Sequence, residues 1–324
     1  MKAISAQFME RKDGFDVVVD GRAVIVHRVD APAFTLARGN PDVAMYRGNF
    51  RIDDSPKGMI APTQIVSIST EAVCLSHDGN PILRLTIIPE YDGFTLCIAS
   101  QQAEFDRLSI TLPATAEERI WGGGEQMSYL NLRGRKFPMW TSEPGVGRDK
   151  STALTQLMDE EGMAGGDYWT TNYPQPTFLS SQNYACHLTS TAYSELDFTD
   201  PGHHRISVCK NTAELRFFFG EDLLSLVRQV SDYFGRPPPL PDWAIGGAIV
   251  GLKDGANSFD RLNHIRAAGA SVSALWCEDW VGVRQTSFGR RLFWDWQWNM
   301  ERYPNLSQHI AQLADDGIRS LWAM

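Results

Sequence analysis

Four residues with the chemistry of a sugar pocket lie in the C-terminal part of the chain. They are a carboxylate, two cations and an indole ring: Glu278, Lys253, Arg291 and Trp294. Aromatic rings stack on the apolar C–H faces of sugars, while sugar hydroxyls need charged or amide partners. An anionic substituent favours Arg, because a planar guanidinium binds two oxygens at once. These residue types therefore predict half of a pocket for a polar, ring-shaped, anionic ligand.

The segment around these residues is rich in tryptophan, which has two interpretations. Five of the chain's ten tryptophans lie between residues 276 and 298. Clustered tryptophans are often core residues, because each indole buries a large area. The site interpretation is favoured by Glu278 and Asp279, two acids that follow the apolar run 272–275 where a parallel strand would end. Carboxylates at the C-terminal ends of parallel strands are typical of binding and catalytic sites.

Length and composition indicate a soluble protein of two domains. At 324 residues the chain exceeds what one core comfortably organises. The net charge of −9 and the lack of a basic block argue against nucleic acid as a partner. Five scattered cysteines without CxxC spacing predict reduced thiols, a cytoplasmic location and no zinc site. Because no run of about 18 apolar residues occurs, we expect no membrane partner. We also expect neither a metal nor a cofactor.

The spacing of apolar residues changes once along the chain. Up to about residue 215, short alternating stretches are separated by Asp20-Gly21, Asp78-Gly79 and Asp92-Gly93, pairs that suit turns with positive φ. This pattern predicts an antiparallel β domain over residues 1–220. An amphipathic helix follows and ends at Gly235. Together with the Pro-rich stretch up to residue 241, it predicts a connector over residues 221–241.

After this connector, strands alternate with helices. The sequence predicts strands over residues 244–252, 271–277 and 318–324, with helices over 258–269 and 306–317. Repeated βα units imply a parallel sheet, either in a barrel or in a doubly wound fold. Three strands are fewer than the eight of a closed barrel, so we expect residues 242–324 to be the beginning of a domain. Lys253 and Glu278 then follow the first and the second strand.

Several long segments resemble glycoside hydrolase family 31, and closely its sulfoquinovosidase branch. The resemblance rests on WGGGEQMSYLNLRGRKFPMWTSEPGVGRDK, GGDYWTTNYPQPTFLSS and RPPPLPDWAIGG, and it covers essentially the whole chain. It implies an N-terminal antiparallel β-sandwich similar to galactose mutarotase, followed by the first three strands of a (β/α)8 TIM barrel. The implied activity is that of a retaining α-glycoside hydrolase acting on α-sulfoquinovosides, such as sulfoquinovosyl glycerol, and releasing sulfoquinovose.

The resemblance also assigns roles to the four residues. Arg291 and Trp294 match the groups that bind the sulfonate, through charge-assisted bonds and through the indole N–H. Lys253 and Glu278 match the pair that one subgroup uses on the ring hydroxyls opposite the sulfonate. Retaining enzymes need a nucleophile and an acid/base. Both are Asp residues on later strands in this family, so we expect no catalytic residue within the chain, both Asp residues beyond Met324, and no activity from the 324-residue chain alone.

Other features have weaker interpretations. Asp254 and Asp279 are interpreted as a loop-shaping and a supporting residue, not as catalytic groups. The glycine run 122–124 suggests a phosphate cradle, but no Lys-Ser/Thr or GxGxxG continuation follows it. Two other functions stay open: a family 31 α-glucosidase or α-xylosidase acting on an uncharged sugar, and a non-catalytic carbohydrate-binding fragment. The first is disfavoured because Arg291 would leave a cation in a neutral pocket.

Overall fold

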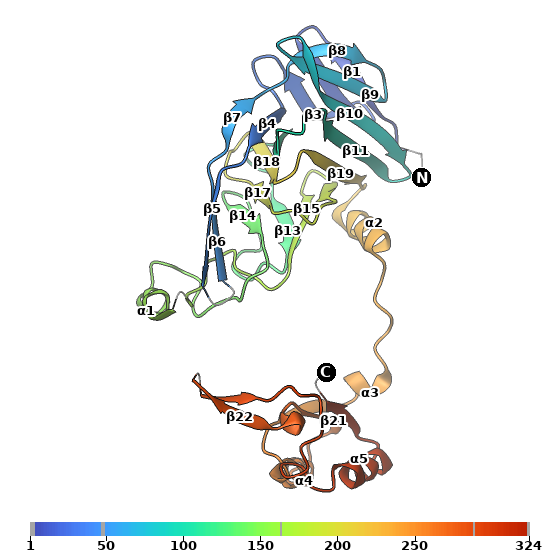
Figure 1. The fold of residues 1–324 in the computed structure, drawn as a ribbon. Helices are drawn as coiled ribbons and strands as arrows, with labels where there is room; N and C mark the ends of the chain where they lie inside the picture. The colour runs from blue at the N-terminus through green and yellow to red at the C-terminus, as the bar shows by residue number, and fades with distance from the viewer. Residues whose placement is uncertain (1–3, 47–48, 163, 288, 323–324) are drawn as a thin grey trace. The chain divides into compact units, whose positions relative to one another are not determined.

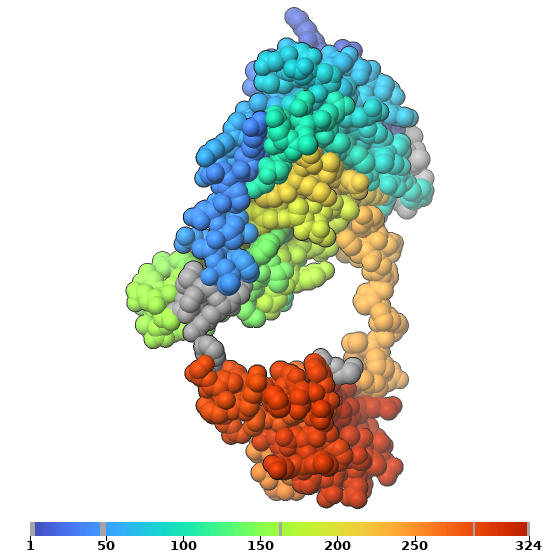
Figure 2. Space-filling model, viewed as in Figure 1, coloured from blue at the N-terminus to red at the C-terminus, as the bar shows by residue number. Residues whose placement is uncertain are grey.

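The chain folds into two compact units, Met1–Gly235 and Arg236–Met324. The computed structural model describes residues 4–46, 49–162, 164–287 and 289–322 (Figure 1). In the space-filling view the first unit runs from blue to yellow-orange and the second from orange to red (Figure 2). The division at Gly235 falls inside the segment 221–241 that the sequence assigns to a connector.

The first unit consists mostly of antiparallel sheets, as the sequence predicts. The largest sheet contains β13 (Ile120–Gly124), β15 (Pro174–Ser180), β16 (Tyr184–Leu188), β19 (Thr212–Phe219), β11 (Gly93–Ser100), β10 (Asn80–Glu90), β9 (Ala72–His77) and β8 (Gln64–Ile68), in this order. The second contains β14 (Lys136–Met139), β17 (Ser194–Asp197), β18 (His203–Val208), β12 (Arg107–Pro113), β4 (Phe34–Arg38) and β7 (Lys57–Ile60). A further sheet contains β1 (Ala6–Arg11), β2 (Gly14–Val19) and β3 (Arg22–Arg28), and β5 (Pro41–Tyr46) pairs with β6 (Asn49–Asp54). Neighbouring strands in these sheets pair antiparallel.

Two of the three predicted turn pairs form hairpin turns with positive φ. Asp20-Gly21 has φ of 46° and 85°, and Asp78-Gly79 has φ of 49° and 77°. Both residues of each pair therefore have the left-handed backbone that tight hairpins need. The prediction for Asp92-Gly93 was off by one residue. Glu90 pairs with Gly93, so the turn consists of Tyr91 and Asp92 and the glycine already belongs to β11.

One apolar core is shared by three sheets of the first unit. It brings together Phe15 of β2, Phe34 of β4 and Phe217 of β19, all fully buried. The rings of Phe94 and Phe217 stack with centroids 4.8 Å apart. Fully burying one such side chain stabilises a fold by about 1.5–3 kcal/mol. The sheets of this unit are therefore held together by common packing.

Among the residues that the structure describes, the first unit has two helices. Helix α2 (Leu223–Phe234) begins after Asp222, whose carboxylate accepts a hydrogen bond of 2.7 Å from the Ser225 amide. It packs Leu226 against Phe218 of the eight-stranded sheet. The predicted amphipathic helix is confirmed, and its packing explains why it groups with the sheets. Helix α1 (Ala153–Gly162) was not predicted from the sequence.

The second unit contains the three parallel strands that the sequence predicts. They are β20 (Ala248–Leu252), β21 (Val272–Cys277) and β24 (Arg319–Trp322), with β21 in the middle. The helices are α3 (Asp242–Ile245), α4 (Asn257–Ala267) and α5 (Leu306–Asp315), with a 3₁₀ turn η1 (Asp279–Val281) and a hairpin of β22 (Val283–Thr286) and β23 (Gly289–Leu292). The first predicted strand begins too early, because residues 242–245 form α3. Pro241 precedes this helix with φ of −66°, an angle that suits a helix start.

Only one face of the parallel sheet is covered within the second unit. Leu252, Leu275 and Cys277 are buried together with residues of α4 and α5. On the opposite face Ile249 is 44% exposed and Trp276 is 41% exposed. The first strand is therefore not buried on both faces within the described unit. Strand residues alternate between faces, and α4 and α5 pack on only one of them.

Candidate functional site

Two of the four predicted site residues meet at the C-terminal edge of the parallel sheet. Lys253 directly follows β20 and Glu278 directly follows β21. Since these strands are neighbours, the two side chains leave the sheet side by side, and Lys253 Nζ forms an ion pair with a Glu278 carboxylate oxygen. The lysine side chain is 63% exposed and the glutamate 23%. An ammonium group has three donors, so Lys253 keeps donors for a ligand while it holds Glu278 in place.

An indole lies near the end of the strand that Glu278 follows. Trp276 of β21 is two residues before Glu278 and is 41% exposed. Its backbone pairs with Gly251 of β20, where an added Cβ would lie 3.9 Å from the indole ring. Glycine therefore leaves the ring uncovered from the neighbouring strand. A flat apolar surface beside a charged pair is what a sugar ring needs.

Arg291 lies on β23 of the hairpin β22–β23. In this hairpin Arg291 is directly opposite Arg284, so two like charges face each other. Such pairs are destabilising unless an anion or another partner compensates them. Arg284 lies over the Phe293 ring at 5.1 Å. Arg291 donates only to the Arg290 carbonyl, at 3.1 Å, and has no ion pair with a residue that the structure describes, so its guanidinium is available to an anion.

The tryptophans after this hairpin divide into exposed rings and anchored rings. Trp294 is 45% exposed, and its centroid lies 5.5 Å from that of Trp296. Trp298 donates its indole N–H to the Tyr303 carbonyl at 2.8 Å, which fixes the end of the segment. Trp294, Trp296 and Trp298 are all at least 37% exposed, so they are not core residues, and the site interpretation stays a prediction.

The structure thus pairs only some of the predicted residues. It joins Lys253 to Glu278 and places Trp294 against Trp296. Within the described ranges, no hydrogen bond or ion pair links Arg291 to Lys253, Glu278 or Trp294. A common pocket for all four residues stays a prediction.

A buried carboxylate that the sequence treated as supporting orders this edge of the unit. Asp279 accepts hydrogen bonds from Arg302 Nε at 2.6 Å and from the Tyr303 hydroxyl. It also accepts a longer contact of 3.4 Å from the Gly255 amide, which follows Lys253 and Asp254 in the chain. Burial, and then the contact with Asp279, raises the pKa of Tyr303, so the phenol stays a donor. Asp279 therefore holds this edge together through Gly255, Arg302 and Tyr303, and these partners carry no signal in the sequence.

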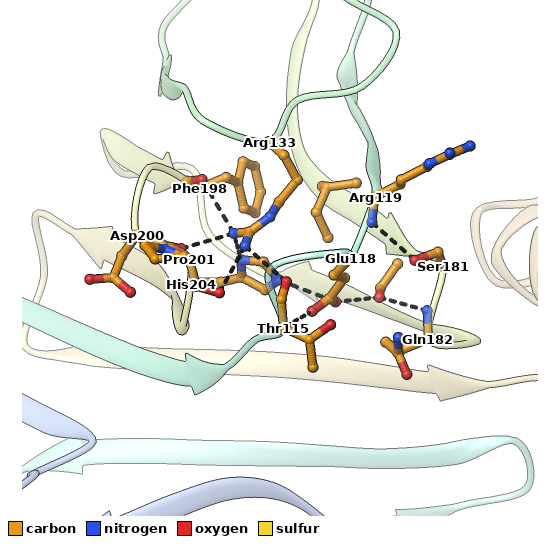
Figure 3. A network of polar contacts seen from close by, with 12 residues as sticks. Thr115, Glu118, Arg119, Arg133, Ser181, Gln182, Phe198, Asp200, Pro201 and His204 are labelled. Carbon is orange, nitrogen blue, oxygen red and sulfur yellow. Dashed lines mark hydrogen bonds and ion pairs between the residues drawn. The ribbon is translucent and has the colours of Figure 1, made fainter.

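The first unit contains a Ser, a His and a Glu in contact, but they do not form a catalytic triad. Glu118 accepts a hydrogen bond from the Ser180 hydroxyl, and His204 Nε2 lies 3.2 Å from the same carboxylate. The other imidazole nitrogen accepts from Arg133, which also donates to carbonyls of the loop 198–201 (Figure 3). In a triad the serine would bond to the histidine, and the nucleophile would be accessible. Here serine, histidine and glutamate are all buried, so the network is structural.

This network perturbs the titration of Glu118. Burial alone would raise its pKa, but the contacts from His204, Ser180 and the Thr115 amide favour the ionised form. The pKa of Glu118 is consequently lowered from 4.5 to about 2. Its charge therefore contributes to the stability of the unit at neutral pH.

The glycine run 122–124 has a packing role. Gly122 and Gly124 have φ of 115° and 81°, which other residues rarely adopt. A Cβ added to Gly124 would lie 2.1 Å from the Tyr173 carbonyl oxygen, and one added to Gly122 would lie 2.5 Å from that of Thr177. These glycines let β13 approach the backbone of β15 and the residue before it. The structure supports no phosphate cradle at this place.

No three His, Cys, Asp or Glu side chains among the described residues come together in a way that suits a metal ion. None of the described helices combines the length and the apolar character that crossing a membrane requires.

Relatives match this chain along nearly its whole length. A sulfoquinovosidase of Agrobacterium fabrum (strain C58 / ATCC 33970) is 50% identical over 318 residues, which cover 97% of this chain and 47% of that protein. A sulfoquinovosidase of Escherichia coli (strain K12) is 38% identical over 320 residues, with the same two coverages of 97% and 47%. The chain therefore spans about half the length of the curated relatives it matches. No protein-family model matches it.

Solved structures agree with this match. A GH31 family sulfoquinovosidase from E. rectale, in complex with the aza-sugar inhibitor IFGSQ, superposes with a TM-score of 0.89 at 38% identity, covering 98% of this chain and 47% of that one. A Flavobacterium johnsoniae GH31 dextranase shares only the fold, with a TM-score of 0.52 at 14% identity. The match covers 99% of this chain and 38% of the dextranase chain. By sequence and by fold, this chain is similar to about half of these sulfoquinovosidases, in agreement with the resemblance of its motifs to glycoside hydrolase family 31.

Proposed function

We propose that the full-length protein to which this chain corresponds is a retaining α-glycoside hydrolase that acts on α-sulfoquinovosides and releases sulfoquinovose. The observation that carries the proposal is the identity of 50% and 38% to two sulfoquinovosidases over 97% of the chain. Neither the α-glucosidase or α-xylosidase alternative nor the non-catalytic one is favoured by these relatives. The Arg291 guanidinium, which forms no ion pair with a residue that the structure describes, supports an anionic substrate independently.

In this proposal the two units have different tasks. Residues 1–220 form a β-sandwich similar to galactose mutarotase, and residues 242–324 begin a (β/α)8 barrel. Residues 221–241 connect these two parts. The uncovered sheet face that carries Ile249 and Trp276 suits the interior of such a barrel. The nucleophile and the acid/base lie outside residues 1–324. Of the acids after β20 and β21, Asp279 is buried in hydrogen bonds and Glu278 is paired with Lys253.

The substrate contacts follow from the charge of each group. A sulfonate is anionic at every working pH, and burying it without a cation would be costly, so Arg291 binds its oxygens and the Trp294 N–H adds a donor. Lys253 donates to ring hydroxyls and Glu278 accepts from them, and the ion pair between them keeps both in position. The partner is thus a small sugar molecule. A cytoplasmic location remains part of the proposal and is supported by five free cysteines.

Arg291→Met in the full-length enzyme tests the proposal. Losing a charge-assisted contact costs roughly 2–5 kcal/mol of transition-state binding, so kcat/KM for 4-nitrophenyl α-sulfoquinovoside should fall about 30-fold or more. The rate with 4-nitrophenyl α-glucoside should stay the same or rise, because this substrate has no anion for the guanidinium to bind.

The matched control is Arg290→Met, an exposed arginine on the same strand whose side chain alternates to the other side of the hairpin. This variant should keep the activity on the sulfonated substrate. If Arg291→Met lowers activity on both glycosides equally, the arginine is a structural residue. An enzyme for uncharged glycosides would prefer the glucoside even before the substitution.

A further inference from the structure

A groove in the first unit lies outside every residue assigned so far. It has a volume of about 550 Å³ and lies between the hairpin β5–β6 and one face of the six-stranded sheet. Phe50, Ile52 and Asp54 of β6 line one side, and residues of β12, β14, β17 and β18 line the other. Figure 1 shows the hairpin running alongside β14 and β17. The groove is large enough for more than one sugar ring.

The floor of the groove presents polar side chains in two rows set by the strand register. One row runs Lys136, Asp197 and Arg205, across β14, β17 and β18. The other runs Glu195, Ser207 and Ser109, across β17, β18 and β12. Each row combines donors with acceptors or with hydroxyls that can be either. A ligand that both donates and accepts hydrogen bonds at short intervals fits such a surface.

An aromatic wall borders this floor. The ring centroid of Trp140 lies 5.5 Å from that of Phe50 and 6.0 Å from that of Tyr193. Trp140 and Ser194 also line a second hollow of about 300 Å³. The indole therefore borders two hollows. This arrangement suits an elongated ligand whose successive units pass a flat apolar ring.

The charges that line the groove cancel. Four acidic side chains are matched by four basic ones: Asp53, Asp54, Glu195 and Asp197 against Arg51, Arg107, Lys136 and Arg205. Arg107 is held by Asp54 at 2.5 Å, and Lys136 by Glu195 at 2.8 Å. Unlike the hairpin of Arg291, this groove has no excess of cations for an anionic group.

The groove is preformed where the hairpin joins the sheet. Asp54 accepts from Arg107 and, at 2.9 Å, from the Asn40 amide, so both ends of the hairpin are tied down. Burial, and then the nearby charge of Glu195, raises the pKa of Tyr193 to about 12, so its phenol remains a donor. Groups that are already held in place lose little freedom when a ligand binds.

We propose that this groove binds an uncharged oligosaccharide chain, at a site separate from the pocket of Arg291. Sugar hydroxyls match the mixed donors and acceptors of the floor, and the C–H faces match Trp140. Arg205 supplies an exposed guanidinium with no ion pair or hydrogen bond to a described residue. The balanced charge distinguishes this ligand from the sulfonated one.

Binding of maltotriose, an uncharged three-sugar chain, to the full-length protein tests the proposal by titration calorimetry without any hydrolysis step. We expect a Kd on the order of 1 mM. Arg205→Ala and Trp140→Ala should each weaken binding by about 5-fold or more. D-Glucose 6-sulfate should not compete for the groove.

Arg84→Ala is the matched control, because Arg84 is an exposed arginine in the middle of β10 on the other large sheet. It should bind maltotriose like the unchanged protein. If Trp140→Ala does not fold, Arg205→Ala still tests the proposal. The Arg205 side chain is exposed, so its replacement leaves the core unchanged. The proposal is overturned by an absence of binding up to about 20 mM maltotriose, by unchanged binding in both groove variants, or by an equal loss in Arg84→Ala.

Discussion

Replacing Glu118 with Gln should make the first unit less stable at neutral pH and change how its stability depends on acid. The carboxylate is buried, and its pKa is lowered from 4.5 to about 2. A lowered carboxyl pKa means that the ionised group stabilises the fold above pH 4.5, and that this contribution is lost as the pH falls toward 2. Gln keeps the shape of the side chain but has no charge. The variant therefore isolates the contribution of the ionised form.

The size of the effect follows from the two pKa values. The difference between 4.5 and about 2 corresponds to a contribution of about 3 kcal/mol at pH 6. At pH 3 the same linkage leaves about 1.4 kcal/mol, because the unfolded carboxyl is mostly protonated there. A loss of about 3 kcal/mol would lower the Tm of a unit of this size by roughly 6–12 °C.

The assay is the free energy of unfolding of protein and variant, measured by denaturant titration at several pH values between 6 and 3. His27 also contributes acid sensitivity, since burial and then Arg28 lower its pKa from 6.5 to about 4. Its contribution is lost between about pH 6.5 and 4 in both proteins and cancels in the difference. Glu117→Gln, an exposed neighbour, is the control and should behave like the unchanged protein.

The expected result is a difference in unfolding free energy that shrinks as the pH falls. A difference that stays constant from pH 6 to pH 3 would refute the reasoning, because the loss would then come from altered packing and not from the charge. A difference equal to that of Glu117→Gln would show that the contacts from His204 and Ser180 do not stabilise the ionised form.

Three further substitutions have expected outcomes. Asp279→Asn should lower the unfolding free energy of the second unit by about 3–5 kcal/mol, because Arg302 loses its buried partner. Tryptophan fluorescence in denaturant measures this loss. Glu301→Gln, at an exposed position, is the control and should change the unfolding free energy little. Asp222→Ala should cost about 1 kcal/mol in a thermal melt, because helix α2 loses its cap. Gly124→Ala should lower the unfolding free energy of the first unit by roughly 3 kcal/mol or more. Gly134→Ala should lower it clearly less, because Gly134 has a similar φ but no atom near the added Cβ. Equal losses in the two variants would contradict the close approach of Gly124 to the Tyr173 carbonyl.

Elements whose sequence pattern repeats could be predicted, and the structure confirms them. The alternation before residue 220 indicated antiparallel sheets, and the order of three strands with two intervening helices indicated parallel strands. The meeting of Lys253 with Glu278 also follows from sequence, because each residue comes just after one of two neighbouring parallel strands.

Elements that depend on tertiary contacts could not be predicted. The hairpin that carries Arg291 has short strands of mixed polarity, and such strands resemble a loop in sequence. Arg302 and Tyr303 bind Asp279 from a segment without any recognisable motif. Helix α3 replaced the start of a strand because its few apolar residues fit either structure at this length. The joint pocket of Arg291, Trp294, Lys253 and Glu278 remains a prediction for the same reason.

The pairing of β11 with β19 has a consequence for how the protein is made. Gly93 pairs with Phe218, so one edge of β11 stays unpaired until β19 is synthesised, about 120 residues later in the chain. At roughly 5–20 residues per second this delay lasts roughly 6–25 seconds. During that interval β8 to β11 present an unpaired strand edge, which is a template for unwanted pairing between nascent chains. We therefore expect the yield of folded protein to depend on translation speed and on chaperones that cover this edge.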